Sequence, residues 1–133
     1  MTPRGDERLT AGERLRGRDA IRRVFESGHS ARRGRVLARF VFAGGREVPL
    51  RIGVAVARGV AGAVGRNRCK RWLREAARRE KGELIPALAS RNCGVDVMLV
   101  WTDASAALQA GQFPETRRSV HELFLAIASR IPA

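Results

Sequence analysis

Apolar residues recur along this chain with two periods, one typical of helices and one typical of strands. Ile21, Val24 and Phe25 have helical spacing and predict a first helix. The segment Thr10-Ala11-Gly12-Glu13 has the form of a capping box, which marks a helix start. Because Gly17 is a poor residue for a helix interior, the helix can also begin several residues later.

Two strands are predicted by alternating apolar positions, and a third by a nearly continuous apolar run. Residues 35–43 and 50–57 each place large apolar residues on one face and mixed residues on the other. Gly44-Gly45 supplies a turn between them. Val95–Trp101 is apolar at almost every position and predicts a more deeply buried strand.

Two further helices complete the pattern. One covers about residues 66–81 and ends at Gly82. The other covers about residues 114–129, with an inner stripe of Val120, Leu123, Phe124 and Ile127. The order is α-β-β-α-β-α, and we predict an α+β fold, a single-domain α/β sandwich. Ordinary chirality would make the crossover through 66–81 right-handed if it joins parallel neighbouring strands.

Length and charge limit the possible functions. The chain has 133 residues, which suits one domain, and 44% hydrophobic residues, which is enough for a core. We divide it into a disordered N-terminal arm (1–12), a domain (13–129) and a tail (130–133). The formal net charge is +13, and 22 of the 26 basic residues lie in residues 1–81. This predicts a polyanionic partner for the first two-thirds, nucleic acid before an anionic membrane surface.

The positive charge is densest in the predicted helix at 66–81, where 8 of 16 residues are Arg or Lys. Its first nine residues hold five cations and no anion, whereas a solvated helix face normally mixes both signs. This crowding favours contact with the phosphates of a nucleic acid over a merely solvated face. Helical spacing places Cys69, Trp72, Leu73 and Ala76 in one apolar stripe. One polar row consists of Arg66, Lys70 and Arg74, and the adjacent row consists of Asn67, Arg71 and Arg78.

Several other chemistries have little support in the sequence. No apolar run approaches the roughly 18 residues of a membrane span, and the N-terminus leads into no signal-peptide core. We therefore expect a cytoplasmic protein. The two cysteines and two histidines lack metal-type spacing, and the acidic residues are scattered. We predict no catalytic residue and no metal ligand, and give isolated acids surface or turn roles: Asp19, Glu26, Asp96 and Asp103.

Aromatic residues in a chain that binds nucleic acid can either stack on bases or pack in the core. Trp72, Phe40 and Phe42 each share a face with aliphatic residues, which favours core packing. Phe25 leaves both interpretations open. Arg117-Arg118 lies in the nearly neutral last third, and we expect it to be solvated.

The central segment resembles the signature of the bacterial ribonuclease P protein component. Ile52–Val56, Gly62–Gly65 and Arg66–Glu75 carry the resemblance, since the family has Arg-Asn-Arg, then a Lys-Arg pair, then Arg-Glu or Arg-Gln. Upstream, Arg14-Leu15, Val24-Phe25 and Gly28 are similar to the family's first helix. The resemblance covers about residues 13–128.

The resemblance implies a fold, a partner and a reaction. The fold is an α/β sandwich with a left-handed βαβ crossover, contrary to the usual rule. The protein partners a catalytic RNA, and together they remove the 5′ leader of precursor tRNA by phosphodiester hydrolysis. Magnesium is bound mainly by the RNA and not by the protein alone, and no obligatory protein partner or membrane is implied. The RNA-binding residues carried over by position are Arg58, Arg66, Asn67, Arg68, Lys70, Arg71 and Arg74.

The cleft that the family uses for the single-stranded leader corresponds here to Ile21, Phe25 and Arg39. This chain departs from the family pattern, because Ile21 and Arg39 replace aromatic residues and Ala57-Arg58-Gly59 replaces Ser-Lys-Lys. The chain has no Tyr, so we expect the cleft to depend more on charge and less on stacking. The alternative function is a structural RNA-binding protein of ribosomal type, which would share the charge and fold class but not the long motif.

Overall fold

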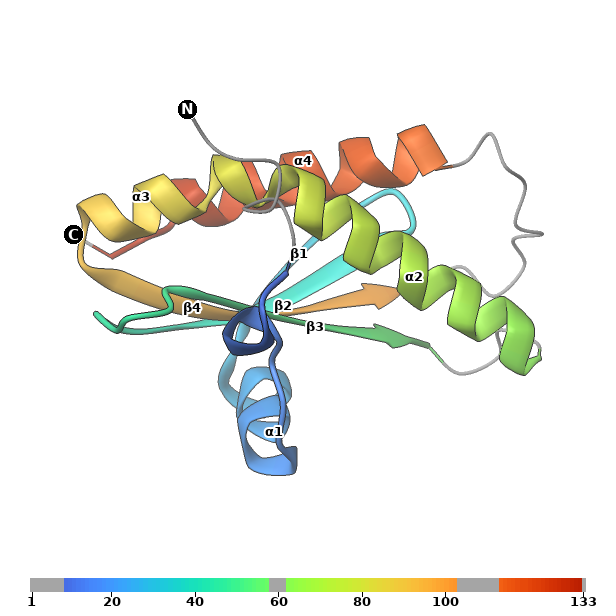
Figure 1. The fold of residues 1–133 in the computed structure, drawn as a ribbon, viewed down its shortest axis with the longest axis horizontal. Coiled ribbons are helices and arrows are strands. Elements are labelled where there is room, and N and C mark those ends of the chain that lie inside the picture. The colour runs from blue at the N-terminus through green and yellow to red at the C-terminus, as the bar shows by residue number, and fades with distance from the viewer. Residues whose placement is uncertain (1–8, 58–61, 103–112, 133) are drawn as a thin grey trace.

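The computed structural model describes residues 9–57, 62–102 and 113–132. Within these ranges the chain forms a mixed α+β fold in which a four-stranded sheet lies between helices (Figure 1). The predicted order α-β-β-α-β-α is confirmed, with additional short elements. In chain order the elements are η2 (Ala11–Glu13), α1 (Arg18–Ser27), β1 (His29–Arg33), β2 (Val36–Gly44), β3 (Leu50–Val56), α2 (Ala63–Glu80), η3 (Lys81–Glu83), α3 (Ile85–Ser90), β4 (Cys93–Trp101) and α4 (Phe113–Ser129).

The strands lie in the order β1-β2-β4-β3. β2 pairs antiparallel with β1 and with β4, placing Phe40 opposite Val97. β3 pairs parallel with β4, placing Ile52 opposite the same Val97, so α2 is the crossover between two parallel neighbours. The left-handed sense of this crossover stays a prediction from the family resemblance.

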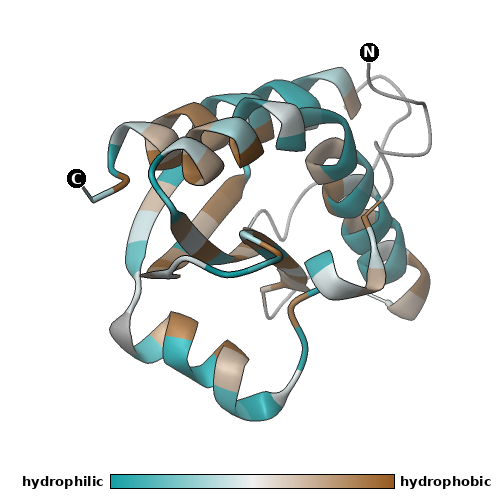
Figure 2. Cartoon of the chain, turned by 60° about the vertical axis from the view of Figure 1, so that its left-hand side comes forward, coloured by the Kyte–Doolittle hydropathy of each residue, from teal (hydrophilic) through white to brown (hydrophobic). Residues whose placement is uncertain are grey.

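The larger core lies between the sheet and α2, α3 and α4, which share one face of the sheet in Figure 1. Alternate residues of the strands point into it, as the period of two requires. Phe40, Leu50 and Trp101 are fully buried there, as are Leu123 and Phe124 of α4. In Figure 2 hydrophobic residues gather on the strands, whereas hydrophilic residues predominate along α2.

The helix α1 lies on the opposite face of the sheet (Figure 1). Val24 packs with Leu15 and with Met98 of β4 in a second, smaller core, joined by half-buried Ile21 and Val41. α1 begins at Arg18, directly after Gly17, whose φ of 96° favours glycine. Of the two helix starts that the sequence left open, the later one, after this glycine, is confirmed.

The sequence pattern missed two elements. β1 is a polar edge strand in which four of five residues are exposed, so it has no apolar face to detect. It joins β2 through the two-residue turn Gly34-Arg35, where Gly34 has a φ of 55°. α3 has six residues with a proline in its first turn, which is too short for a helical period to show. α2 also begins at Ala63, earlier than predicted.

The end of the predicted N-terminal arm is ordered. Thr10 and Glu13 form a complete capping box around η2, as the sequence indicated, although the helix that it caps is a short 3-10 helix. Leu9 packs against the larger core. Residues 9–12 of the predicted arm therefore belong to the folded domain, whose start we predicted at residue 13. Residues 1–8 lie outside the described residues.

Candidate nucleic-acid interface

The helix α2 presents one buried side and one exposed basic side. Cys69 is 1% exposed and Leu73, Ala76 and Ala77 are 0% exposed, so the apolar stripe faces the sheet. The period of 3.6 residues then turns the remaining side chains outward. Exposed or half-buried on this outer side are Arg66, Asn67, Arg68, Lys70, Arg71 and Arg74. The structure therefore brings together six of the seven predicted RNA-binding residues, and Arg58 lies outside the described residues.

The start of α2 adds to this positive surface. Gly62 occupies the N-cap position with a φ of 78° and offers no side chain to cap the helix. The first turn also contains no acidic residue. The first turn of the helix thus supplies no carboxylate of its own to compensate the positive end of the helix dipole, which favours binding of anions near Arg66 and Asn67.

The cations of α2 divide into two groups at Glu75. Glu75 accepts hydrogen bonds from Arg78 and from Arg79, the latter at 2.9 Å from Nε to Oε1. The hydrogen bond from Arg78 lowers the pKa of Glu75 most, and the bond from Arg79 lowers it further. Partial burial acts in the opposite direction but is outweighed, so the pKa of Glu75 falls to about 2. By contrast, Arg68, Lys70, Arg71 and Arg74 form no ion pair or side-chain hydrogen bond with any described residue. Their charge is available to a ligand, whereas that of the last turns is neutralised within the protein.

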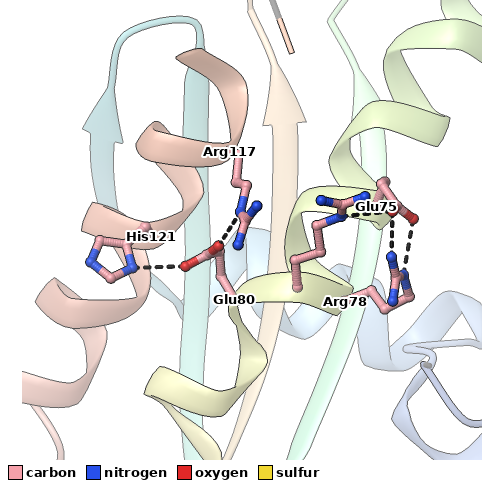
Figure 3. A network of polar contacts seen from close by, with 6 residues as sticks. Glu75, Arg78, Glu80, Arg117 and His121 are labelled. Atoms are coloured by element: carbon pink, nitrogen blue, oxygen red, sulfur yellow. Dashed lines mark hydrogen bonds and ion pairs between the residues drawn. The ribbon is translucent and has the colours of Figure 1, made fainter. Parts of the chain in front are cut away.

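Glu80 continues the neutralised group (Figure 3). It is 8% exposed, and its carboxylate accepts a hydrogen bond from Arg117 Nε at 2.5 Å. The Nδ1 atom of His121 lies 2.8 Å from the other carboxylate oxygen. Burial raises the pKa of Glu80, but the bonds to Arg117 and His121 outweigh it, and the pKa lies below its usual value. Arg117, which we expected to be solvated, is half of an ion pair between α4 and α2; sequence spacing gave no signal of this pairing.

Trp72, a residue of α2, packs against β4 and α4. Its ring lies edge-on to Trp101, with centroids 6.3 Å apart, and edge-on to Phe113 at 5.9 Å. It is half-buried against the larger core. The preference for core packing over base stacking is confirmed for Trp72 and for fully buried Phe40, and half-buried Phe42 packs against the same core.

The three predicted leader-cleft residues lie together on the opposite face of the sheet. Ile21 and Phe25 come from α1, and Arg39 comes from β2. Arg39 donates from Nη2 to the main-chain oxygen of Phe25 at 2.5 Å, which ties it to the C-terminal turn of α1. Phe25 is 40% exposed, whereas Ile21 packs into the smaller core. One exposed ring and one half-buried guanidinium therefore line this face, and their role toward RNA stays a prediction.

The described buried carboxylates form ion pairs within the protein and do not form a magnesium site. In the described part of the chain, Glu80, Glu83 and His121 are a group close enough to share a cation. The charge of Arg117 on Glu80 opposes a cation there, so this group does not fit a magnesium site. The predicted surface or turn role is wrong for Asp96, which is 2% exposed within the buried strand β4, where Arg46 neutralises it at 2.6 Å. Asp103 lies outside the described residues. Asp19 and Glu26 are exposed on α1.

Comparison with known proteins identifies the family and the fold of the chain. A family model for ribonuclease P matches residues 9–130. Among solved structures, a Staphylococcus aureus RNase P protein mutant with defective mRNA degradation activity is 21% identical, with 89% of each chain covered and a TM-score of 0.64. The RNase P protein from Thermotoga maritima is 27% identical, with 91% of this chain and 99% of that chain covered and a TM-score of 0.56.

No curated protein sequence matches the chain. The structure of the Thermotoga maritima protein in complex with 1-(4-fluorophenyl)-2-thiourea is 28% identical, with 90% of this chain and 100% of that chain covered and a TM-score of 0.57. Among the described residues, the helices are too short or too polar to cross a membrane.

Proposed function

The chain belongs to the ribonuclease P protein family, and we propose that it is the RNA-binding subunit of a ribonuclease P that removes the 5′ leader of precursor tRNA. One observation carries the proposal. The outer side of α2, from Arg66 to Arg74, gathers the Arg-Asn-Arg and Lys-Arg motif, and four of its cations have no partner among the described residues. Such unneutralised charge costs folding free energy and is stabilised by phosphates.

Each face of the sheet has a role in this proposal. The α2 surface binds the catalytic RNA, mainly through phosphates, because guanidinium groups make bidentate contacts with them. The opposite face, with Phe25 and Arg39, holds the single-stranded leader of the substrate. Only one exposed aromatic ring is available there among the three cleft residues, so charge contributes more than stacking.

The bond cleavage belongs to the RNA in this proposal. Hydrolysis of a phosphodiester needs a positioned base or carboxylates that hold magnesium. Of the two described carboxylates that cluster, Glu80 is already paired with Arg117, which opposes a cation beside Glu83. Magnesium would be held mainly by the catalytic RNA. The protein then contributes binding and positioning, which raise substrate affinity. The chain acts in the cytoplasm, where the precursor tRNA substrate is made.

The test is a cleavage assay of a precursor tRNA transcript with a transcribed bacterial ribonuclease P RNA, with and without this protein. We expect the RNA to cleave at lower substrate concentration when the protein is present, and the protein alone to be inactive. Cleavage that survives digestion of all RNA would contradict the proposal. The proposal would also be contradicted if the folded protein left precursor tRNA cleavage by the catalytic RNA unchanged at every magnesium concentration.

A second measurement asks whether any protein side chain performs chemistry. Each Asp, Glu and His is replaced in turn, and the single-turnover rate is measured at saturating enzyme and magnesium. We expect every folded variant to stay within about tenfold of the wild type, roughly 1.4 kcal/mol of barrier. A loss of many thousandfold in one RNA-bound variant would show a protein active site.

A further inference from the structure

A groove of about 370 Å³ lies where the N-terminal segment meets β3 and α2. Three arginines from distant parts of the sequence line it: Arg14, Arg16 and Arg74. The rest of the lining is Leu9, Leu15, Ile52, Gly53 and Val54. No carboxylate is among the described residues that line it, so these residues join three positive groups on an otherwise apolar floor.

The fold holds the two N-terminal arginines in place. The main chain of Leu15 donates to Ile52 of β3 at 2.9 Å, and Arg14 and Ile52 form a parallel bridge. Leu15 is 6% exposed and anchors the segment in the smaller core, so its neighbours Arg14 and Arg16 lie outward. The main chain that carries these two side chains is thus held along the outer edge of β3, which is an edge strand of the sheet.

The acidic residue nearest in sequence cannot neutralise this groove. Glu13 is 8% exposed and is bound to Lys81, with 3.0 Å between Oε1 and Nζ. Arg14, Arg16 and Arg74 form no side-chain hydrogen bond or ion pair with any residue in the described ranges. The groove between α2 and α4 differs in this respect, because its Arg79 and Arg117 are paired with carboxylates.

Arg74 connects the groove to the surface of α2. It is the last member of the row formed with Arg66 and Lys70, so a strand bound along this row reaches the groove at its end. A volume of about 370 Å³ lies in the range of small-ligand sites, roughly 300–1,000 Å³, and admits a phosphate with its sugar.

We propose that this groove binds the phosphate backbone of RNA and that Arg14 and Arg16 extend the α2 surface across the edge of β3. The inference rests on the proposed function, because it takes the RNA bound by α2 as the strand that continues. The contact is with phosphates, through guanidinium groups, and carries no base preference of its own. Neither Arg14 nor Arg16 belongs to the motif that the sequence singled out for RNA binding.

The test compares three double variants that remove charge, and one that keeps it, with the wild type in binding a transcribed bacterial ribonuclease P RNA over a range of salt concentrations. Arg14→Gln/Arg16→Gln changes the groove, and Arg68→Gln/Arg71→Gln changes α2 alone. Arg32→Gln/Arg33→Gln is the matched control, since it removes two charges from exposed residues of β1 at the opposite edge of the sheet.

The groove variant should lower the slope of log affinity against log salt by about 1.4–1.8, which is two phosphate contacts at about 0.7–0.9 each. At 0.1 M salt this corresponds to a loss of roughly 25- to 60-fold in affinity if the affinities converge at 1 M. The β1 control should change the slope by less than half as much. Arg14→Lys/Arg16→Lys, which keeps the charge, should restore most of the slope.

The outcomes separate this inference from the proposed function. If the α2 variant loses affinity and the groove variant behaves like the β1 control, the groove is not part of the interface. If the α2 variant also binds normally, the proposed function itself fails. The replaced side chains are exposed, so the Tm of each variant should match that of the wild type. If Arg14→Gln/Arg16→Gln melts at a lower temperature, the single variants Arg14→Gln and Arg16→Gln are measured instead. Unchanged salt slopes in both single variants would overturn the inference.

Discussion

Replacing Glu80 by Gln tests the network that joins α2 to α4. The carboxylate of Glu80 is nearly buried, bonded to Arg117 at 2.5 Å and next to His121 at 2.8 Å. A hydrogen bond to a charged group contributes about 1.5–3 kcal/mol, but Arg117 is 45% exposed, so solvent screens its share. Gln keeps one acceptor and turns an amide toward the other donor. We expect Glu80→Gln to lower the free energy of unfolding by about 2 kcal/mol.

For a chain of this length, about 2 kcal/mol corresponds to a Tm lowered by roughly 6–10 °C. The assay is thermal unfolding at pH 7, followed by circular dichroism. Glu83→Gln is the matched control, because Glu83 is an exposed carboxylate three residues away and should change the Tm by no more than about 2 °C. Equal Tm values for the two variants would refute the argument that the Glu80 contacts stabilise the fold.

The pH dependence of the stability difference between the wild type and Glu80→Gln gives a second test. The pKa of Glu80 is lower in the folded protein than its usual value of 4.5. Its contribution is therefore complete above about pH 4.5 and is lost as the pH falls through the lowered folded pKa. The stability difference between wild type and Glu80→Gln should shrink from pH 5.5 toward pH 3. A constant difference over this range would contradict the assignment.

Three other predictions concern stability and reactivity. Trp72→Ala should lower the free energy of unfolding by about 2–4 kcal/mol, less than for a fully buried Trp because the ring is half-buried, as urea unfolding would measure. Asp96→Asn should cost about 1.5–3 kcal/mol, because Arg46 loses its carboxylate partner but keeps the main-chain oxygens of Val48, Pro49 and Val95; an effect below about 0.5 kcal/mol would contradict this. Burial raises the pKa of the Cys69 thiol, so iodoacetamide should modify half-buried Cys93 first in the native protein, as peptide mass spectrometry would detect; equal rates would count against the buried position of Cys69.

The elements with a strong apolar period were predictable from the sequence. The inner stripe of α4, with Val120, Leu123, Phe124 and Ile127, is fully buried as expected, because a helix that packs on a sheet must repeat its apolar residues every three to four positions. The same reasoning placed Cys69 and Leu73 inward and the motif of α2 outward. β1 and α3 escaped detection because one has no apolar face and the other is shorter than two helical turns.

The partition of charge was decided by the tertiary structure alone. The sequence determined that α2 is basic and that its apolar stripe faces inward, since both follow from spacing along one helix. Which cations remain available depends on partners far away in sequence, as when Arg117 reaches Glu80 or Lys81 reaches Glu13. The groove of Arg14, Arg16 and Arg74 likewise exists only because the N-terminal segment pairs with β3. Local periodicity fixes which face a side chain takes, but only the packing of distant segments fixes which charges meet.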